Sequence, residues 1–145
     1  MPNATTTEPD LAELAQLVPI HLKEEARRAH SRDSSRAVPD GLPVAVAVPI
    51  TTAQVAAALS WANKHHIPVA VRGAGSGLSG GAMSYEGGLT ISLLGFTQIE
   101  VDPTNLLATV GAGVITADLD RAASLHGLMY APDPVSSELS TIGGN

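Results

Sequence analysis

The sequence predicts a fold of mixed helices and strands, and three patterns in the chain support this prediction. Between residues 43 and 71, short apolar runs typical of strands flank a segment with helical periodicity, so this stretch is expected to form a strand–helix–strand unit. A fainter unit of the same kind follows between residues 107 and 131. A loop with five glycines in nine residues, Gly73 to Gly81, comes directly after the first unit.

Composition sets the broad limits. The chain has 145 residues, which is enough for one ordinary domain. It contains no Cys, so disulfides, a thiol nucleophile and Cys-ligated metals are excluded within it. The net charge is −6, and aromatic residues are few, so nucleic acid is not expected as a partner. The start lacks the features of a signal peptide, and the longest apolar run, residues 44–50, is too short to span a bilayer. These features predict a cytoplasmic protein without a transmembrane segment.

Residues 1–39 read as a polar tail followed by one or two short helices. Thr7 and Asp10 are spaced as an N-cap pair for a helix with leucines on one face, at positions 11, 14 and 17. Pro19 ends or restarts this helix, and a weaker apolar stripe follows it among charges typical of a solvated helix face. Residues 31–39 resemble a linker, so we expect the main domain to begin at residue 40.

The first unit has clear boundaries. A strand bounded by prolines, residues 43–49, precedes a capping box made by Thr51 and Gln54. The helix that follows runs through Lys64, and its predicted buried face carries Val55, Leu59 and Ala62. Residues 69–71 form the next strand, and we expect the two strands to be parallel neighbours joined by a right-handed crossover. The glycine loop then leaves from the carboxyl end of the second strand, where open α/β sheets place their ligands.

The rest of the chain continues with strands and one more helix. Strands are predicted at residues 89–94 and 98–101, followed by a turn at 102–105 and a further strand at 107–115. Thr116 is expected to cap a helix that carries Leu119, Ala122 and Ala123 on its apolar face and is stopped by Gly127. A short strand is expected at residues 128–131.

The glycine loop has the composition of an anion-binding loop. Ordering so many glycines is costly in entropy, and the usual reason for an ordered glycine loop is a group that approaches the backbone closely. Successive backbone N–H groups in such a loop can converge on an anion. Arg72 is the only cation between Lys64 and Arg121, so a phosphate would be held mainly by amides. Arg72 could itself contact a phosphate or the substrate, or form a surface ion pair.

Two common phosphate-binding loops do not fit the sequence. A P-loop needs a Lys that is absent here, and a Rossmann loop opens a helix, whereas this loop leads into the strand at residues 89–94. A flexible connection between two strands remains the alternative.

Four segments in order carry a resemblance to a known family: Thr51 to Ala56, Val71 to Ala82, Gly127 to Ser137 and Thr141 to Asn145. With these segments the chain resembles the FAD-binding domain of the vanillyl-alcohol oxidase and p-cresol methylhydroxylase superfamily. The likeness is greatest to the FAD subunit of glycolate oxidase and to FAD-linked D-lactate dehydrogenases, and it covers roughly residues 40–145.

The resemblance implies an α+β fold in which residues 40–145 form a PCMH-type FAD-binding domain. The first α+β subdomain would be complete and the second truncated, so the sequence reads as cut after Asn145. FAD would lie between the subdomains and be non-covalently bound, because Ser76 stands where covalently flavinylated relatives carry a His. The residues implied to bind the pyrophosphate are Gly73, Ala74, Gly75, Ser76, Gly77, Leu78, Ser79, Gly80 and Gly81. Those implied to line the flavin side are Pro132, Asp133, Thr141, Gly143, Gly144 and Asn145.

The resemblance also implies a function, the oxidation of a 2-hydroxy acid such as D-lactate or glycolate by hydride transfer to FAD. The substrate would be a small molecule, the electron acceptor is not indicated, and a homo-oligomer or a partner subunit is possible. No catalytic base is identified, because the five histidines all read as helix-end or surface residues, and no metal site is expected. The base and metal ligands of this branch would follow Asn145, so the isolated chain is expected to be inactive.

Two other functions stay open from the sequence. The chain could be a non-catalytic flavin-binding or assembly subunit of a larger oxidoreductase. It could also bind nothing alone and associate with a complementary fragment through exposed sheet edges. The coding sequence after Asn145 would distinguish them, since a substrate domain there favours the enzyme.

Overall fold

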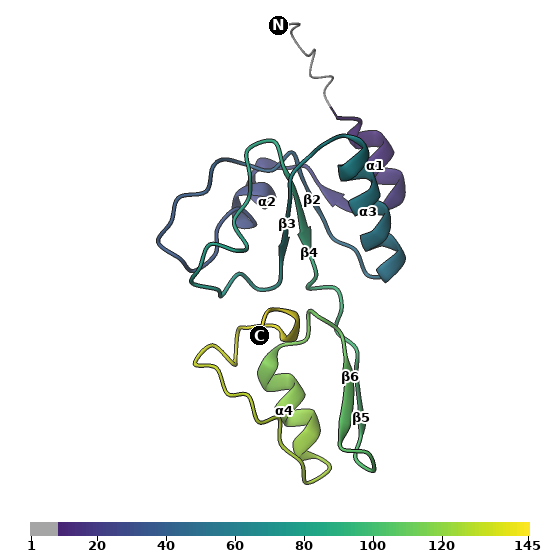
Figure 1. The fold of residues 1–145 in the computed structure, drawn as a ribbon, viewed down its shortest axis with the longest axis vertical. Coiled ribbons are helices and arrows are strands. Elements are labelled where there is room, and N and C mark those ends of the chain that lie inside the picture. Colours follow the sequence, from purple (N-terminus) through teal and green to yellow (C-terminus); the bar gives the residue numbers. More distant parts are fainter. Residues whose placement is uncertain (1–8) are drawn as a thin grey trace, which may run out of the picture.

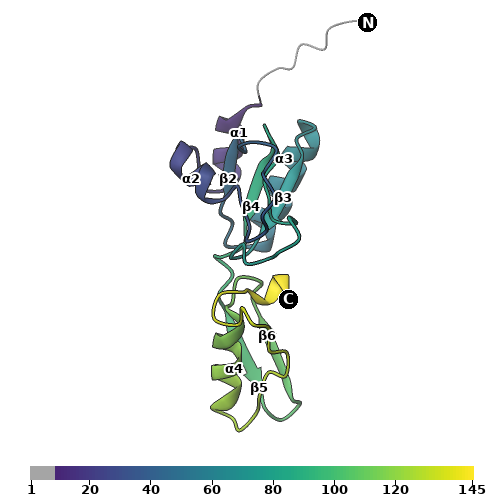
Figure 2. The ribbon, with the colours of Figure 1, turned by 90° about the vertical axis from the view of Figure 1, so that its left-hand side faces the viewer.

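The computed structural model describes residues 9–145, which form two lobes of mixed helix and sheet (Figures 1 and 2). The upper lobe in Figure 1 contains a four-stranded sheet and three helices, and the lower lobe contains a two-stranded sheet and one helix. The predicted α+β class is confirmed. The elements of the upper lobe are α1 (Leu11–Leu17), β1 (Ile20–His21), α2 (Glu24–Ala29), β2 (Ala45–Ala47), α3 (Thr52–Lys64), β3 (Val69–Arg72) and β4 (Leu89–Ser92). Those of the lower lobe are β5 (Ile99–Asp102), β6 (Leu107–Val110), α4 (Thr116–Ser124) and the short 3-10 helix η1 (Ile142–Gly144).

The sheet of the upper lobe has the strand order β1-β2-β4-β3. β2 and β3 both run parallel to β4, and β1 is antiparallel to β2. The prediction that β2 and β3 are neighbours is therefore wrong, because β4 lies between them. All four residues of β4 are buried, and the centre of a parallel sheet is the position that covers both faces of a strand.

Helices cover both faces of this sheet, with α1 and α3 on one side and α2 on the other (Figures 1 and 2). The predicted buried face of α3 is partly wrong, because Leu59 is 42% exposed while Ala58, Trp61 and Ala62 are buried. These three positions share one helix face, and the large Trp61 side chain decides which face turns inward. The buried core consists of Leu14, Val18, Ala45, Ala47, Ala58, Trp61, Ala62, Leu89 and Ile91.

The helix starts follow local hydrogen bonding. α3 begins as predicted, since Thr51 Oγ1 accepts a hydrogen bond from the Gln54 N–H at 3.2 Å. α1 carries the three predicted leucines, but it begins later than a cap at Thr7 implies. Its N-cap is Asp10, whose carboxylate accepts from two backbone N–H groups of the first turn. The other half of the predicted cap pair, Thr7, lies outside the described residues.

The helical stripe predicted directly after Pro19 is wrong, because Ile20–His21 is β1 and pairs with β2. The open edge of β2 offers backbone partners there, and the chain becomes helical only at Glu24. The following segment, residues 31–39, has no regular secondary structure, as expected of a connection. It is nevertheless packed on the glycine loop, as described below.

The lower lobe confirms the helix and the turn and corrects two strands. The Asp102 carboxylate accepts from the N–H groups of Thr104 and Asn105, which closes the predicted turn between β5 and β6. β6 ends at Val110 instead of residue 115. Beyond it, Gly111 and Gly113 approach the backbone of residues 93–96 so closely that a Cβ would lie 2.3 Å from a carbonyl oxygen at each.

The N-cap of α4 is Ile115 and not the predicted Thr116, which is the first residue of the helix. α4 ends at Ser124, and the predicted stop Gly127, with a φ of 72°, lies in the turn that follows, where the Leu128 N–H donates to the Ala123 carbonyl. The strand predicted at residues 128–131 is wrong. The N–H of Tyr130 donates to Asp120 Oδ1 at 2.8 Å, so a side chain takes the place of a strand partner. Within residues 9–145, every helix is too short or too polar to cross a membrane.

Candidate cofactor cleft

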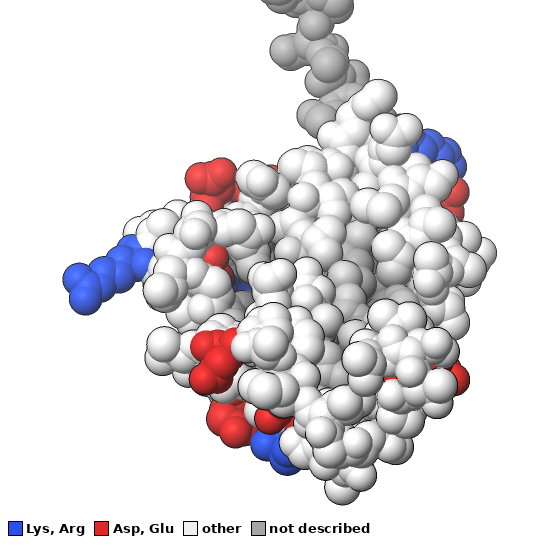
Figure 3. Space-filling model, turned by 60° about the horizontal axis from the view of Figure 1, so that its bottom comes forward, with Lys and Arg blue, Asp and Glu red and all other residues white. Residues whose placement is uncertain are grey.

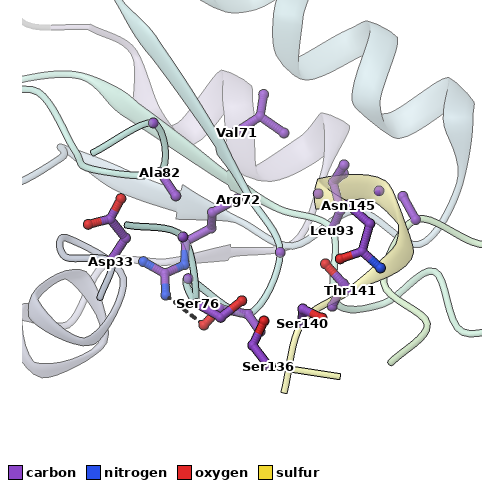
Figure 4. A pocket seen from close by; sticks show the side chains of 18 of the residues that line it. Asp33, Val71, Arg72, Ser76, Ala82, Leu93, Ser136, Ser140, Thr141 and Asn145 are labelled. Carbon is purple, nitrogen blue, oxygen red and sulfur yellow. Dashed lines mark hydrogen bonds between the residues drawn. The ribbon is translucent and has the colours of Figure 1, made fainter. Parts of the chain in front are cut away.

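A cleft of about 510 Å³ lies where the glycine loop of the upper lobe meets the carboxyl-terminal segment of the lower lobe (Figure 4). The loop after β3 supplies one wall, and residues 134–145 supply much of the other. Most of the residues predicted to bind FAD line this cleft: Gly73, Ala74, Gly75, Ser76, Gly77, Ser79, Gly81, Thr141, Gly143, Gly144 and Asn145.

Four predicted residues do not line the main cleft. Leu78 is 77% exposed, and Gly80 lies in the loop with a φ of 79°. Pro132 and Asp133 line a second cavity of about 330 Å³ beside α4. The structure therefore does not gather all predicted residues into one cavity, and a flavin contact by Pro132 or Asp133 stays a prediction.

The glycine loop has an ordered backbone whose carbonyls are turned toward protein donors. The Ala74 carbonyl accepts from Arg72 Nη2 at 3.3 Å, the Gly75 carbonyl from Ser34 Oγ at 3.2 Å, and the Gly77 carbonyl from the Ser34 N–H at 3.0 Å. In a trans peptide the carbonyl and the following N–H point in opposite directions, and residues 9–145 contain no cis peptide bond. The N–H groups after these carbonyls therefore point away from the donors.

These amides are available to a ligand. The backbone N–H groups of residues 75–79 donate to no other residue within the described part of the chain. Successive unpaired amides in a glycine loop are the kind of donors that can bind an anion. The carbonyl contacts to Ser34 and Arg72 give the loop a defined backbone, which does not favour the alternative of a flexible connection.

The glycines of the loop serve different purposes. Gly75 has a φ of 75°, in the left-handed region that favours glycine, and a Cβ there would lie 2.1 Å from the Arg72 guanidinium. A Cβ on Gly73 would lie 2.0 Å from Thr141 Oγ1, so this glycine permits the close approach of the two lobes. Gly77 and Gly81 line the cleft, yet a Cβ on either would meet no atom within 4 Å. The space beside these two glycines is consistent with a group held against the backbone.

Arg72 is buried, and among residues 9–145 it forms hydrogen bonds to carbonyls and no salt bridge. It is 8% exposed, and its Nη1 donates to the Arg32 carbonyl at 2.7 Å while Nη2 reaches Ala74. Burial lowers the pKa of Arg72 from its ordinary value, and the nearby Asp33 carboxylate opposes this shift. Hydrogen bonding to Ser35 is the main cause that lowers the pKa of Asp33.

Asp33 and Ser34 were missed by the sequence analysis. They lie in the segment read as a linker, and no periodicity or motif there indicates contact with a loop forty residues away. Figure 4 shows Asp33 and Arg72 beside each other on one side of the cleft, with Thr141 and Asn145 on the other.

A small polar network forms the lower-lobe wall. The Thr116 hydroxyl lies 2.9 Å from the Ser140 hydroxyl and accepts from Asn145 Nδ2 at 2.6 Å. Thr141 is buried and its backbone pairs with Ile115. This network fixes the backbone around Gly143 and Gly144 at the mouth of the cleft.

The cleft has little cationic charge. Arg72 is its one Lys or Arg among the described residues, and both of its terminal nitrogens already bond to carbonyls. Most of the face drawn in Figure 3 is white, and its large blue groups lie toward the margins. None of the histidines lines the cleft, and the described residues contain no group of three His, Asp or Glu arranged for a metal ion. A bound anion would therefore depend on backbone amides.

Comparison with known proteins agrees with this geometry. A model of the FAD binding domain family matches residues 43–145. The chain is 45% identical over 105 residues to the glycolate oxidase subunit GlcD of Bacillus subtilis, covering 72% of this chain and 22% of that protein. It is 46% identical over 99 residues to a D-lactate dehydrogenase of Archaeoglobus fulgidus, covering 68% of this chain and 22% of the relative. The chain thus spans about a fifth of the length of these relatives.

Solved structures share the fold. p-Cresol methylhydroxylase with substrate bound superposes with a TM-score of 0.77 at 16% identity, over 90% of this chain and 27% of that one. Alkyldihydroxyacetonephosphate synthase gives a TM-score of 0.75 at 20% identity, over 86% and 25% of the two chains. At these identities the likeness concerns the fold alone.

Proposed function

Because the chain belongs to the family of FAD-binding domains, we propose that it is the amino-terminal part of a flavin-dependent oxidoreductase that holds the FAD pyrophosphate on the loop Gly73–Gly81. The observation that supports this most is the row of free backbone N–H groups at residues 75–79. They line or adjoin a cleft that offers an anion no free cationic side chain. Amide donors are then the means by which the two phosphates would be held.

The opposite wall of the cleft would face the flavin. Thr141, Gly143, Gly144 and Asn145 come from the lower lobe, so a cofactor held by the loop would lie between the lobes. Pro132 and Asp133 would reach it only from the second cavity. Ser76 offers no nucleophile of the kind that links flavin in covalent relatives, which supports a non-covalent cofactor.

We propose a 2-hydroxy acid, of the glycolate or D-lactate type, as the substrate. This rests on relatives named as a glycolate oxidase subunit and a D-lactate dehydrogenase, each covered over only 22% of its length. FAD, when bound, supplies a hydride acceptor for the carbon that bears the hydroxyl. The residues of this chain would position the cofactor and exclude water, and no His within the described residues lies at the cleft to take the hydroxyl proton.

We propose that the proton acceptor, the electron acceptor and any partner subunit lie outside residues 1–145, because this chain spans only 22% of its relatives. The cytoplasmic location stays a prediction. We expect the isolated chain to be inactive for the same reason. An assay of residues 1–145 with FAD, glycolate or D-lactate and an artificial electron acceptor tests this, and turnover would contradict it.

The experiment that tests the proposed site is a Gly77→Val substitution in the full-length protein. Gly77 has no left-handed φ, and a Cβ added to it would meet no atom within 4 Å, so the variant should fold normally. Its side chain would occupy the space proposed for the pyrophosphate. We expect FAD affinity to fall by about tenfold or more, measured by titration of FAD into the apoprotein with flavin fluorescence.

The matched control is Ala56→Val, which adds bulk at an exposed position of α3 that does not line the cleft. It should keep wild-type FAD affinity. Wild-type affinity in the folded Gly77→Val protein would contradict the proposed site.

A further inference from the structure

The segment ahead of the family-matched region packs directly on the glycine loop. Ser34 contributes two hydrogen bonds, from its N–H to the Gly77 carbonyl at 3.0 Å and from its Oγ to the Gly75 carbonyl at 3.2 Å. The Arg32 carbonyl accepts from Arg72, and the Ser31 carbonyl accepts from the Ser84 N–H at 3.1 Å on the far side of the loop. Residues 31–34 therefore contact the middle of the loop through Ser34, and the residues just before and after the loop through Arg32 and Ser31.

We propose that residues 31–35, called here the clasp, hold the glycine loop in its anion-binding form, and that Ser34 and Arg72 are positioning residues for FAD. The inference rests on the proposed function of the loop. It extends the cofactor site to residues outside the matched region, which begins at residue 43.

The physical argument concerns the direction of the peptides. A hydrogen bond from Ser34 or Arg72 to a loop carbonyl fixes the plane of that peptide. The N–H group of the next residue lies in the same plane, so its direction is fixed as well, which applies to Gly75, Ser76 and Leu78. A loop with five glycines would otherwise sample many backbone conformations, and binding would have to remove that freedom. Contacts that order the loop before FAD arrives remove part of this cost from the binding step.

The geometry of Arg72 favours bracing over direct phosphate binding. Its guanidinium places Nη1 on the Arg32 carbonyl and Nη2 on the Ala74 carbonyl, so one planar group joins the clasp to the loop. Asp33 lies beside it as a counter-charge, as Figure 4 shows. A Lys could keep the charge at this position, but it could not reproduce two donors in a fixed fork.

This difference gives a test that separates the two roles. Three variants of the full-length protein are compared with wild type by FAD titration of the apoprotein: Ser34→Ala, Arg72→Gln and Arg72→Lys. We expect Ser34→Ala to weaken FAD binding by about threefold to tenfold, since one neutral hydrogen bond is lost. Arg72→Gln should weaken it by about tenfold or more, and Arg72→Lys by nearly as much.

Further readouts exclude a general loss of stability. Ser60→Ala, at an exposed position of α3, is the matched control for Ser34→Ala and should bind FAD as wild type does. Thermal unfolding of each apoprotein identifies variants that are folded at the titration temperature. The double variant Ser34→Ala/Arg72→Gln should lose less than the product of the single losses, because both residues order the same loop.

Salt dependence adds a further distinction. If Arg72 only orders the loop, Arg72→Gln should have the same salt dependence of FAD binding as wild type. If Arg72 contacts a phosphate directly, the salt dependence should be smaller in Arg72→Gln.

The outcomes separate the clasp from the cofactor site itself. A wild-type protein that binds no FAD overturns both the proposed function and this inference. A wild type that binds FAD, with folded Ser34→Ala and Arg72→Gln variants of equal affinity, overturns the clasp alone. Near-complete retention of affinity by Arg72→Lys, with loss in Arg72→Gln, overturns the bracing role of Arg72 and assigns it to the phosphate. If Arg72→Gln does not fold, the Ser34→Ala titration alone decides.

Discussion

At the scale of single residues, the cleft depends on loop positions that carry no side chain. Gly75 is required by its backbone conformation and by the adjacent guanidinium, while Gly77 and Gly81 have open space beside them. The two kinds of glycine should respond differently to substitution. A side chain at Gly75 would strain the loop itself, whereas a side chain at Gly77 would act only on what the loop holds.

Ser76 carries a prediction about the cofactor linkage. The chain has no Cys, and Ser76 lies in the cleft where a linking His would be expected from the resemblance. Acid precipitation of the full-length holoprotein should therefore release the flavin of this segment entirely into the supernatant. A flavin-bearing peptide from residues 1–145, found by mass spectrometry of a tryptic digest, would refute non-covalent attachment.

At the scale of elements, α1 is attached to α3 by a few polar contacts around a buried ring. Trp61 Nε1 donates to the Asp10 carbonyl at 3.2 Å, and Trp61 itself is 2% exposed. The Glu13 carboxylate accepts from Lys64 Nζ at 2.7 Å and lies 3.1 Å from His65 Nε2. The end of α3 therefore supports the first helix.

A pH dependence follows for Glu13. Hydrogen bonding to Lys64, and then to His65, lowers the pKa of Glu13 below its ordinary value of 4.5. A carboxyl whose pKa is lower in the folded than in the unfolded protein stabilises the folded state. This stabilisation is complete at a pH above the pKa of the unfolded state, and it is lost as the pH falls through the pKa of the folded state. Urea unfolding should thus show Glu13→Gln to be less stable than wild type at pH 7, by a small amount because the pair is exposed.

The difference should shrink as the pH falls below 4.5. The control is Glu138→Gln, at the exposed carboxylate that bonds Arg121 in the other lobe. A stability difference for Glu13→Gln that is constant from pH 7 to pH 3 would contradict this assignment.

The sequence was most informative about elements with a local signal. The Thr51 cap of α3, the leucine-bearing helix α1, the Asp102 turn and the glycine turn after α4 all depend on neighbours within a few residues, and the structure has each of them. The Gln54 side chain, however, accepts from the Ile50 N–H and not from Thr51, so the capping box is only half formed. The prediction that β2 and β3 are neighbours was wrong, because β4 enters between them after a long loop. The strand at 128–131 failed because the Asp120 side chain binds the amide of Tyr130.

At the scale of the whole molecule, the site residues with a local sequence signal were likewise predicted, and those defined by distant contacts were not. The glycine loop and residues 141–145 were identified by composition and resemblance, and the structure places most of them in one cleft between two lobes. Asp33 and Ser34 were not identified, because their contacts join the loop to a segment with no pattern of its own. The burial of Arg72 likewise depends on the lobe around it and is not visible in the sequence.

The arrangement of the lobes also explains why the loop can be both folded and open. Carbonyls of the glycine loop accept hydrogen bonds from Ser34 and Arg72 of the upper lobe. The amides of residues 75–79 have no such partner and are available to a ligand at the junction of the lobes. The central claim is that these amides hold the pyrophosphate of FAD.

A crystal structure of the full-length protein with bound FAD tests this claim most directly. We predict that pyrophosphate oxygens accept hydrogen bonds from at least two backbone N–H groups between Gly75 and Ser79, at N···O distances of about 2.7–3.2 Å. Arg72 should remain on the carbonyls of Arg32 and Ala74. A pyrophosphate bound elsewhere, with the loop amides facing only water, would contradict the account.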